Sequence, residues 1–218
     1  MITLGLDTST RTASVAIVDD GRVLAETRGE RAHELLVLID SACTAANITA
    51  HDLQAVAVGA GPGSFTGLRI GMATAKGIAF AANCPLWTVS SLAALAFDEL
   101  EPERVVVAVL DARKNELYAG AYRRDGDRTV LVGEERVFPP AALAAFVPPG
   151  ARIVGDAVAE LAGHSVTFPR TPSGAAVAKL ALEGSRIDVL VSGAPSYIRP
   201  SEAEVKYPDG VPGALKRR

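Results

Sequence analysis

The alternation of apolar and polar positions divides the chain into two halves that follow the same order. Each half opens on three short stretches with the alternation of strands, separated by turn residues such as "DDG" and "DGD". Short turns of this kind join antiparallel neighbours, so each half is predicted to begin with an antiparallel meander. The three strands are expected at residues 2–9, 12–21 and 22–29 in the first half, and within 104–138 in the second.

Segments of helical and strand length follow each meander. Apolar residues at helical spacing predict helices, and short apolar runs bounded by Gly or Pro predict strands. After the first meander the expected helices are 33–48, 72–82 and 91–100, and the expected strands are 53–59 and 85–90. After the second meander the expected helices are 140–147, 157–162 and 173–184, and the expected strands are 151–156 and 165–169. The chain from Pro195 onward is predicted to be extended.

Two successive units of strands, then alternating helices and strands, predict an α/β protein with a mixed sheet in each half. The internal duplication favours the actin/Hsp70/sugar-kinase architecture, in which each half is a ribonuclease H-like sheet with helices. We expect residues 1–101 to form a first actin-like subdomain that carries partner-binding helices. Residues 102–218 are expected to form a second, smaller actin-like subdomain with a C-terminal tail.

Composition adds a cellular setting to this architecture. The two cysteines, Cys43 and Cys84, lie far apart in apolar surroundings, which is typical of small buried side chains rather than of a disulfide framework. The first residues, "MITLGLDTST", lack the basic region and apolar core of a signal peptide, and no apolar run approaches the ~20 residues that span a membrane. A cytoplasmic protein without a membrane segment is therefore expected.

The charge of the chain gives little attraction to nucleic acid. The formal net charge is −3, and no basic run is interleaved with aromatic residues. The densest basic points are "RRDGDR" and the final "LKRR". The isolated chain is therefore expected to bind RNA weakly and with strong sensitivity to salt.

The stretch Gly59–Gly71, "GAGPGSFTGLRIG", connects an expected strand to an expected helix. A phosphate-binding P-loop needs a lysine after its last glycine, and a dinucleotide-binding loop needs a third glycine; this stretch has neither in place. A helix N-terminus with free amide groups remains, which can bind an anion or be capped by Ser64 or Thr66. Capping is the commoner use.

Small residues recur every four positions in this region, at Gly67, Gly71, Ala75 and Ala79. Glycine in a helix costs roughly 1 kcal/mol relative to alanine, so a close neighbour is expected to offset that cost. The neighbour is either this protein's own sheet or another subunit. The preceding helix is apolar nearly all round and favours the second alternative. The residues predicted to bind a partner are Leu35, Leu36, Leu38, Ile39, Gly67, Gly71 and Ala75.

Three charged residues have a functional and a structural interpretation. Asp7, followed by three hydroxyl residues, could hold a metal–nucleotide complex or satisfy the amides of a turn. Asp111, shortly before Lys114 in "DARKNELYAG", could belong to a catalytic pair or to a charged hairpin tip. Arg199 could bind a carboxylate or phosphate, or fasten the tail to its own domain.

No catalytic residue, metal site or cofactor is predicted. His33, His51 and His164 have no histidine companion at metal-binding spacing. The nucleophile candidates Ser64, Ser90 and Cys84 lack the "GxSxG" elbow and a base at recognisable spacing.

Four motifs in the same order resemble the TsaB (YeaZ) family over essentially the whole chain. They are "DTST" at residues 7–10, "GPGSFTGLRIG" at 61–71, "DARKNELYAG" at 111–120 and "PSYIRPSEAE" at 195–204. The resemblance implies a role in making threonylcarbamoyladenosine beside the tRNA anticodon. It implies an auxiliary subunit that binds the paralogous transferase TsaD, with the small ATPase TsaE associated and tRNA contacted indirectly. A homodimer through the same first-half helices is also implied.

Two other functions remain open at this point. One is an independent actin-like ATPase or small-molecule kinase, which would turn over ATP with magnesium when purified alone. The other is a homodimeric scaffold unrelated to tRNA, whose depletion would leave tRNA modification unchanged.

Overall fold

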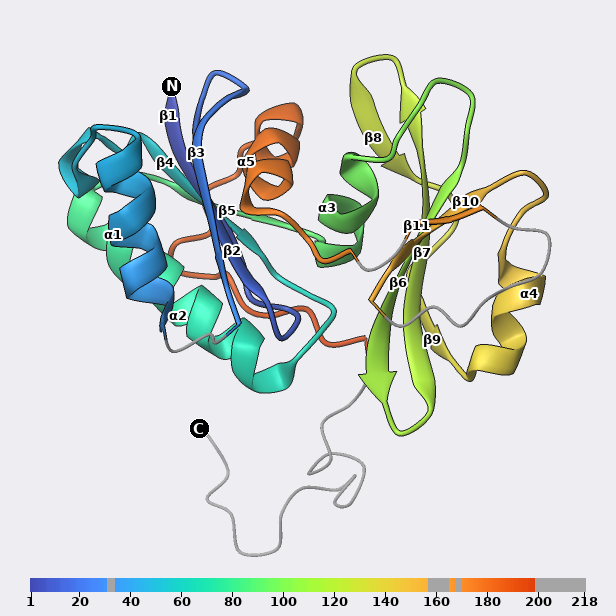
Figure 1. Ribbon diagram of the computed structural model, residues 1–218. Helices are drawn as coiled ribbons and strands as arrows, with labels where there is room; N and C mark the ends of the chain where they lie inside the picture. Colours follow the sequence, from blue (N-terminus) through green and yellow to red (C-terminus); the bar gives the residue numbers. More distant parts are fainter. Residues whose placement is uncertain (31–33, 157–164, 168–169, 199–218) are drawn as a thin grey trace, which may run out of the picture.

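In the computed structural model, two units of sheet and helix lie side by side (Figure 1). The structure describes residues 1–30, 34–156, 165–167 and 170–198. The first unit holds a five-stranded sheet, and the second holds a six-stranded sheet. An α/β protein with a mixed sheet in each half is therefore confirmed.

The first sheet has the order β3-β2-β1-β4-β5. Strands β1 and β2 pair antiparallel, as do β2 and β3, whereas β4 is parallel to β1 and β5 is parallel to β4. The tight turn between β2 and β3 uses Asp20 and Gly21, both with positive φ. The strands are β1 (Ile2–Asp7), β2 (Ala13–Asp19), β3 (Arg22–Gly29), β4 (Ala55–Gly59) and β5 (Leu86–Val89).

The second sheet repeats this order. It runs β11-β10-β6-β7-β8, with β9 paired to β7, and β6 takes the central place that β1 has in the first sheet. The expected run of three strands in 104–138 contains a fourth, β9. The strands are β6 (Val106–Arg113), β7 (Glu116–Asp125), β8 (Arg128–Leu131), β9 (Arg136–Phe138), β10 (Arg152–Gly155) and β11 (Ser165–Thr167). The repeated order is the internal duplication predicted from the sequence, and it fits the predicted actin-like fold.

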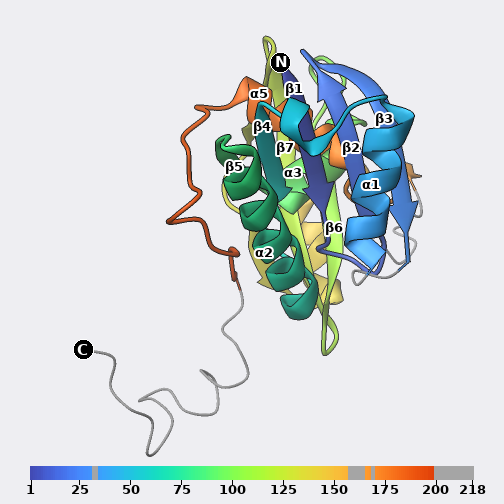
Figure 2. The same cartoon turned by 90° about the vertical axis from the view of Figure 1, so that its left-hand side faces the viewer.

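Helices α1 (Leu35–Ala45) and α2 (Phe65–Ala82) cover the outer face of the first sheet (Figure 2). Large side chains such as Leu4, Leu6 and Ile17 point toward them and form a core with no exposure to solvent. In the second unit, the short helix α4 (Leu143–Phe146) packs on the outer face of its sheet. The connections also contain the 3₁₀ turns Ala50–Asp52 and Pro140–Ala142.

Helices α3 (Ser91–Phe97) and α5 (Gly174–Glu183) lie between the two sheets, and each packs on the sheet of the other half (Figure 1). Helix α3 follows β5 but packs against β6, β7 and β10, whereas α5 follows β11 but packs against β1, β2 and β4. The inner face of the first sheet is built of small residues, so α5 approaches it closely. A Cβ atom on Gly5 would lie 2.1 Å from the carbonyl oxygen of Gly174.

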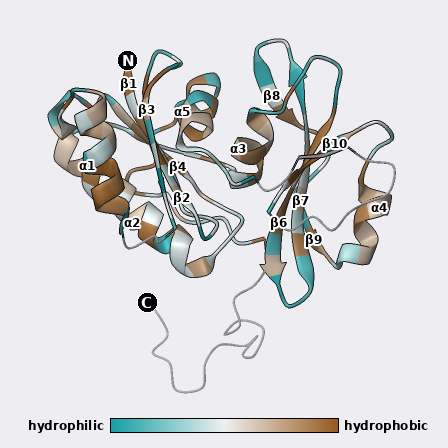
Figure 3. Ribbon diagram, viewed as in Figure 1, coloured by the Kyte–Doolittle hydropathy of each residue, from teal (hydrophilic) through white to brown (hydrophobic). Residues whose placement is uncertain are grey.

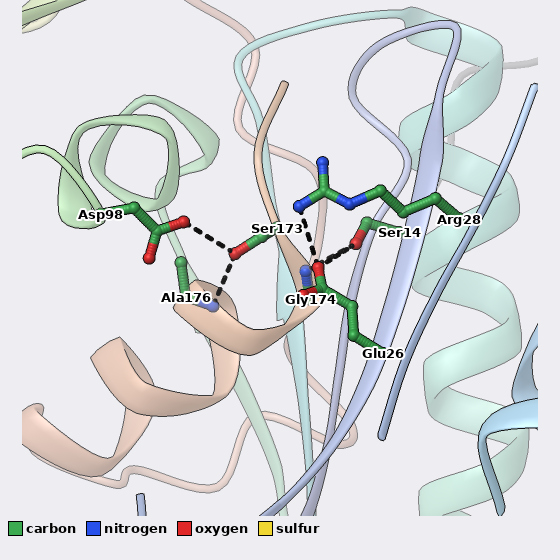
Figure 4. A network of polar contacts seen from close by, with 7 residues as sticks. All are labelled: Ser14, Glu26, Arg28, Asp98, Ser173, Gly174 and Ala176. Carbon is green, nitrogen blue, oxygen red and sulfur yellow. Dashed lines mark hydrogen bonds and ion pairs between the residues drawn. The ribbon is translucent and has the colours of Figure 1, made fainter. Parts of the chain in front are cut away.

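Polar contacts hold the N-terminus of α5 at this position (Figure 4). The Ser173 hydroxyl caps the helix by accepting from the Ala176 amide at 2.9 Å, and it donates to Asp98 at 3.3 Å. The Gly174 amide donates to the Ser14 hydroxyl on β2 at 2.9 Å. The first turn of α5 is thus tied to the residue that follows α3 and to the first sheet. The boundary predicted between residues 101 and 102 stays a prediction.

After α5 the chain returns along the first unit, and we call residues 185–198 the strap. The Val189 amide donates to Leu86 O on the edge strand β5 at 2.8 Å, and the Ser196 amide donates to Ala60 O at 2.6 Å. Figure 2 shows the strap on the side of α2 that is away from α1. The expected helix at 157–162 and most of the expected tail lie outside the described residues.

Candidate functional site

Asp7 closes β1 and is completely buried. Its Oδ1 accepts from the Ser9 amide at 2.8 Å and from the Ser9 hydroxyl at 2.6 Å, and its Oδ2 accepts from the Ser91 hydroxyl at 2.6 Å. A Cβ atom on Gly59 would lie 1.9 Å from Oδ2, so the neighbouring strand leaves no room there for a side chain. Both carboxylate oxygens are therefore used inside the protein.

Burial raises the pKa of Asp7 above its usual value, and the hydrogen bonds from Ser9 and Ser91 oppose that rise in part. The carboxyl group joins the loop between β1 and β2 to the start of α3, because Ser9 lies in that loop and Ser91 belongs to that helix. These contacts fit the structural interpretation of Asp7, in which it satisfies turn amides and hydroxyl groups.

The glycine-rich stretch packs directly against Asp7 and the two serines that bind it. The Gly61 amide donates to the Ser91 hydroxyl at 3.2 Å, and the Ser64 amide donates to Ser9 O at 2.7 Å. The Ser64 hydroxyl then caps α2 by accepting from the Gly67 amide at 3.3 Å. The amides of Gly61, Ser64 and Gly67 are thus bonded within the chain, as expected for a turn with a helix cap. Helix α2 accordingly begins at Phe65, earlier than the expected residue 72.

The stripe of Gly67, Gly71 and Ala75 faces this protein's own first sheet. A Cβ atom on Gly67 would lie 2.1 Å from Thr8 O, and one on Gly71 would lie 2.2 Å from Thr8 Oγ1. Ala75 is fully buried in the same core. The glycines thus make a close approach of the kind that the sequence predicted, and the neighbour in the structure is Thr8, directly after β1.

The predicted partner-binding residues of α1 divide between the inside and the outside. Leu35 and Ile39 are buried in the core, and Leu38 packs partly against it. Leu36 keeps 65% of its surface exposed. Val37, an apolar residue of this helix that was not among the predicted partner-binding residues, is 66% exposed beside it. Figure 3 colours much of α1 as hydrophobic.

The outer side of α2 also presents apolar and bare positions. Phe80 is 78% exposed, and Ala73 is exposed about two turns before it. At Gly77, a Cβ atom would meet no described atom within 4 Å. We call Leu36, Val37, Ala73, Gly77 and Phe80 the α1–α2 face. With α2 beginning at Phe65, a period of about 3.6 residues places Ala73, Gly77 and Phe80 on the opposite side of the helix from the buried stripe. The sequence therefore contained the signal for this outer set.

The nucleophile candidates have structural roles. Ser64 caps α2, and Ser90 caps α3 by accepting from the Ala93 amide at 3.1 Å. Ser90 also donates to the carboxylate of Glu135. Cys84 is a buried thiol whose pKa is raised by burial, which disfavours the reactive thiolate.

The hairpin after β6 carries Asp111 at its base. The Asp111 carboxylate pairs with the Arg113 guanidinium at 3.0 Å and accepts from the Arg113 amide at 2.7 Å. Residues 113–115 all have positive φ, which shapes the tip. These contacts fit the charged hairpin tip. Arg199 lies outside the described residues.

Only one of the three histidines lies in the part of the chain that the structure describes. His33 and His164 lie outside the described residues, and His51 lies in a 3₁₀ turn. Within the described part of the chain, no group of three or more His, Cys, Asp or Glu side chains is arranged to hold a metal ion. No helix in that part is long and apolar enough to cross a bilayer.

Known proteins share both the sequence and the fold. The family model for TsaD, tRNA N6-adenosine threonylcarbamoyltransferase, matches residues 26–204. YeaZ from Pseudomonas aeruginosa superposes with a TM-score of 0.71 at 31% identity, over 84% of this chain and 92% of that chain. A second P. aeruginosa structure, an uncharacterized protein with similarity to peptidase YEAZ, gives a TM-score of 0.78 at 30% identity, over 91% of this chain and 99% of that chain. The chain carries the TsaD family domain and belongs to the TsaB (YeaZ) family.

Curated TsaB proteins are among the sequence relatives. The tRNA threonylcarbamoyladenosine biosynthesis protein TsaB of Escherichia coli is 36% identical over 61% of this chain. That match spans 59% of the E. coli protein, and the match to the Haemophilus influenzae protein spans 56% of that one. The TsaB of Bacillus subtilis is 28% identical, over 95% of this chain and 98% of its own length.

Proposed function

We propose that this chain is an auxiliary, non-catalytic subunit for threonylcarbamoylation of the adenosine beside the tRNA anticodon. The observation that carries the proposal is membership of the TsaB family, because curated relatives bear the name tRNA threonylcarbamoyladenosine biosynthesis protein. In this role the chain binds and supports a TsaD-like transferase in a heterodimer. Its place of action is the cytoplasm.

The α1–α2 face is the proposed surface for the transferase. Its large members are well exposed, with 65% at Leu36 and 78% at Phe80. An apolar set of this kind on two neighbouring helices is typical of a surface that a partner covers. Between the large side chains, Ala73 and Gly77 leave the α2 backbone accessible to a second helix at short distance.

The other proposed partners follow from the same pathway. A TsaE-like ATPase joins the pair, and tRNA is contacted within the complex. A homodimer would use the α1–α2 face in place of the transferase, so the two assemblies would compete.

The contacts of Asp7 support an auxiliary role over an independent ATPase. A carboxylate that serves magnesium and nucleotide must direct an oxygen toward them. Asp7 has no exposure, and Ser9 and Ser91 donate to its two oxygens. With magnesium and ATP, the purified chain is therefore expected to hydrolyse ATP only at background rate.

Reconstituted tRNA modification tests the function. Threonylcarbamoyladenosine is measured in tRNA after incubation with the transferase, the ATPase and their substrates, with and without this chain. We expect modification to depend on the chain. Equal modification in its absence would refute the auxiliary role. It would favour the alternative of a homodimeric scaffold unrelated to tRNA.

The variant Leu36→Glu tests the surface in the same assay. A carboxylate at Leu36 is tolerated in the free chain because the position is exposed, but in a covered interface it would be buried without a partner. We expect weaker binding of the transferase in calorimetry and less modified tRNA. The matched control is Leu131→Glu, on β8 of the second unit, where the side chain is 43% exposed. Unchanged affinity for Leu36→Glu would remove this part of α1 from the interface.

A further inference from the structure

An exposed cluster of two aromatic rings and an arginine lies where the strap meets the start of α2. The ring of Phe65, the first residue of α2, lies 5.2 Å from the ring of Tyr197 at an interplanar angle of 33°. The guanidinium of Arg69 lies over the Phe65 ring, with its carbon 3.8 Å from the ring centre, and its Nε donates to the Tyr197 hydroxyl at 3.2 Å. We call these three residues the stacking cluster.

The cluster is held in place from both sides before any ligand arrives. The Ser196 amide is bonded to Ala60 O at 2.6 Å, which fixes the residue before Tyr197. Ile198, the residue after it, packs against the core of the second unit. Nearer the start of the strap, Lys76 of α2 donates to Val191 O at 3.3 Å. The position of the Tyr197 ring is therefore set by the strap, and little ordering remains for binding.

The rings stay open to solvent in this arrangement. Phe65 is 42% exposed and Tyr197 is 43% exposed, although each contacts the other. Covered aliphatic side chains would fasten the strap to the helix equally well, so fastening alone does not explain two exposed rings. Two part-exposed rings joined to a guanidinium instead make a rigid, flat and cationic surface.

The local charge favours a polyanion. The sequence of α2 contains Arg69 and Lys76 and no acidic residue, although the whole chain carries a net charge of −3. Both basic side chains contact the strap, so the positive charge lies on the strap side of the helix. A phosphate backbone that approaches the rings would meet these two cations.

We propose that the stacking cluster binds an unpaired nucleobase of RNA, with Arg69 and Lys76 facing the adjoining phosphates. Proteins recognise single-stranded RNA by stacking splayed bases on aromatic rings and on guanidinium planes. The inference deepens the proposed function, on which it rests: the RNA is the anticodon loop of tRNA, whose nucleotides are unpaired. A free nucleotide offers the same base chemistry and forms a separate arm of the test.

Fluorescence anisotropy with a labelled tRNA anticodon stem–loop tests the cluster on the full chain at low salt. Phe65→Leu and Tyr197→Leu keep an apolar side chain and remove the ring, and we expect each to weaken binding by about fivefold or more. The matched control is Phe138→Leu. Phe138 forms a similar ring pair with Phe146, 5.1 Å apart, in the second unit. Thermal melting of each variant confirms that the chain is folded.

The arginine has a test of its own. Arg69→Gln is expected to weaken binding and to make the plot of log affinity against log salt shallower by about 0.7, as the loss of one phosphate contact to a single strand requires. Arg104→Gln removes an exposed arginine elsewhere and is expected to leave the affinity and slope unchanged.

The outcomes separate the proposals. A fully paired RNA duplex is expected to bind equally to the chain and to its ring variants. Wild-type affinity in Phe65→Leu and Tyr197→Leu would overturn the inference, even if tRNA modification still requires the chain. Ring-dependent binding of ATP without ring-dependent binding of the stem–loop would overturn RNA as the ligand. Ring-dependent binding of the stem–loop by a chain that is dispensable for modification would support the stacking and refute the proposed function.

Discussion

Asp7 is a carboxyl group enclosed by hydroxyl groups, and burial raises its pKa. The folded protein therefore holds this proton to a higher pH than the unfolded chain, in which the pKa is near 3.8. The free energy of unfolding falls as the pH rises from below 3.8 through the raised pKa and then stays constant with respect to this group.

The variant Asp7→Asn tests this balance. Asn keeps the size of the side chain and one acceptor oxygen but cannot ionise. In urea titrations at several pH values, we expect the stability of the variant relative to the natural protein to rise with pH over that window. Asp7→Ala leaves the Ser9 and Ser91 hydroxyls without their acceptor and is expected to cost about 1–3 kcal/mol. A stability difference for Asp7→Asn that does not vary with pH would show that Asp7 has no raised pKa.

The sequence limited the role of Asp7 to two alternatives but could not choose between them. The deciding contact comes from Ser91, which lies 84 residues away and reaches Asp7 only because β5 and α3 follow next to β4 in the fold. The stacking cluster was missed for the same reason. Phe65 and Tyr197 are far apart in the chain, and no local run shows aromatic and basic residues interleaved.

At the scale of elements, helix α2 has a buried stripe and an open one. Gly71 belongs to the first, where a Cβ atom would lie 2.2 Å from Thr8 Oγ1, and Gly77 belongs to the second, where the space is open among the described residues. The four-residue spacing predicted the buried stripe correctly. It could not tell which surface covers the stripe, because own sheet and partner demand the same small residues.

The pair Gly71→Leu and Gly77→Leu separates the two faces. Gly71→Leu overpacks the core and is expected to cost about 1–3 kcal/mol, which lowers the melting temperature of the free chain by about 2–4 °C for each kcal/mol. The Gly77→Leu variant is expected to have a melting temperature equal to or above that of the unsubstituted chain, since leucine favours helix more than glycine does. Its affinity for the transferase should nevertheless fall by roughly five- to 150-fold. Normal affinity in Gly77→Leu would exclude close packing of a partner on α2.

At the scale of the whole molecule, the repeated pattern of strands and helices was sufficient to predict two duplicated sheets. The pattern did not predict that α3 and α5 each pack on the opposite half. Hydrophobic periodicity shows that a helix has a buried face, but it does not say which sheet buries that face. The small residues Gly5 and Ala16 on the inner face of the first sheet were the available signal.

The variant Gly174→Val tests how α5 joins the halves. A Cβ atom at Gly174 would lie 2.6 Å from Gly5 O and 2.6 Å from the Ala16 amide nitrogen, so the helix must move away from the sheet. We expect a loss of about 1–3 kcal/mol in unfolding free energy. The single tryptophan, Trp87, packs in the cluster with α5 and reports the change by fluorescence. Unchanged stability together with unchanged Trp87 emission would contradict this close packing.

The exchange of α3 and α5 between the halves also limits which amino-acid substitutions the protein can accept during evolution. The inner face of the first sheet fits a helix that is encoded in the second half of the gene, and the reverse holds for α3. An enlarged side chain at Gly5 or Ala16 therefore requires an accommodating change in α5, far along the gene. The two sheets share one order of strands, yet neither half can be replaced alone, because the helix that covers the inner face of each sheet belongs to the other half.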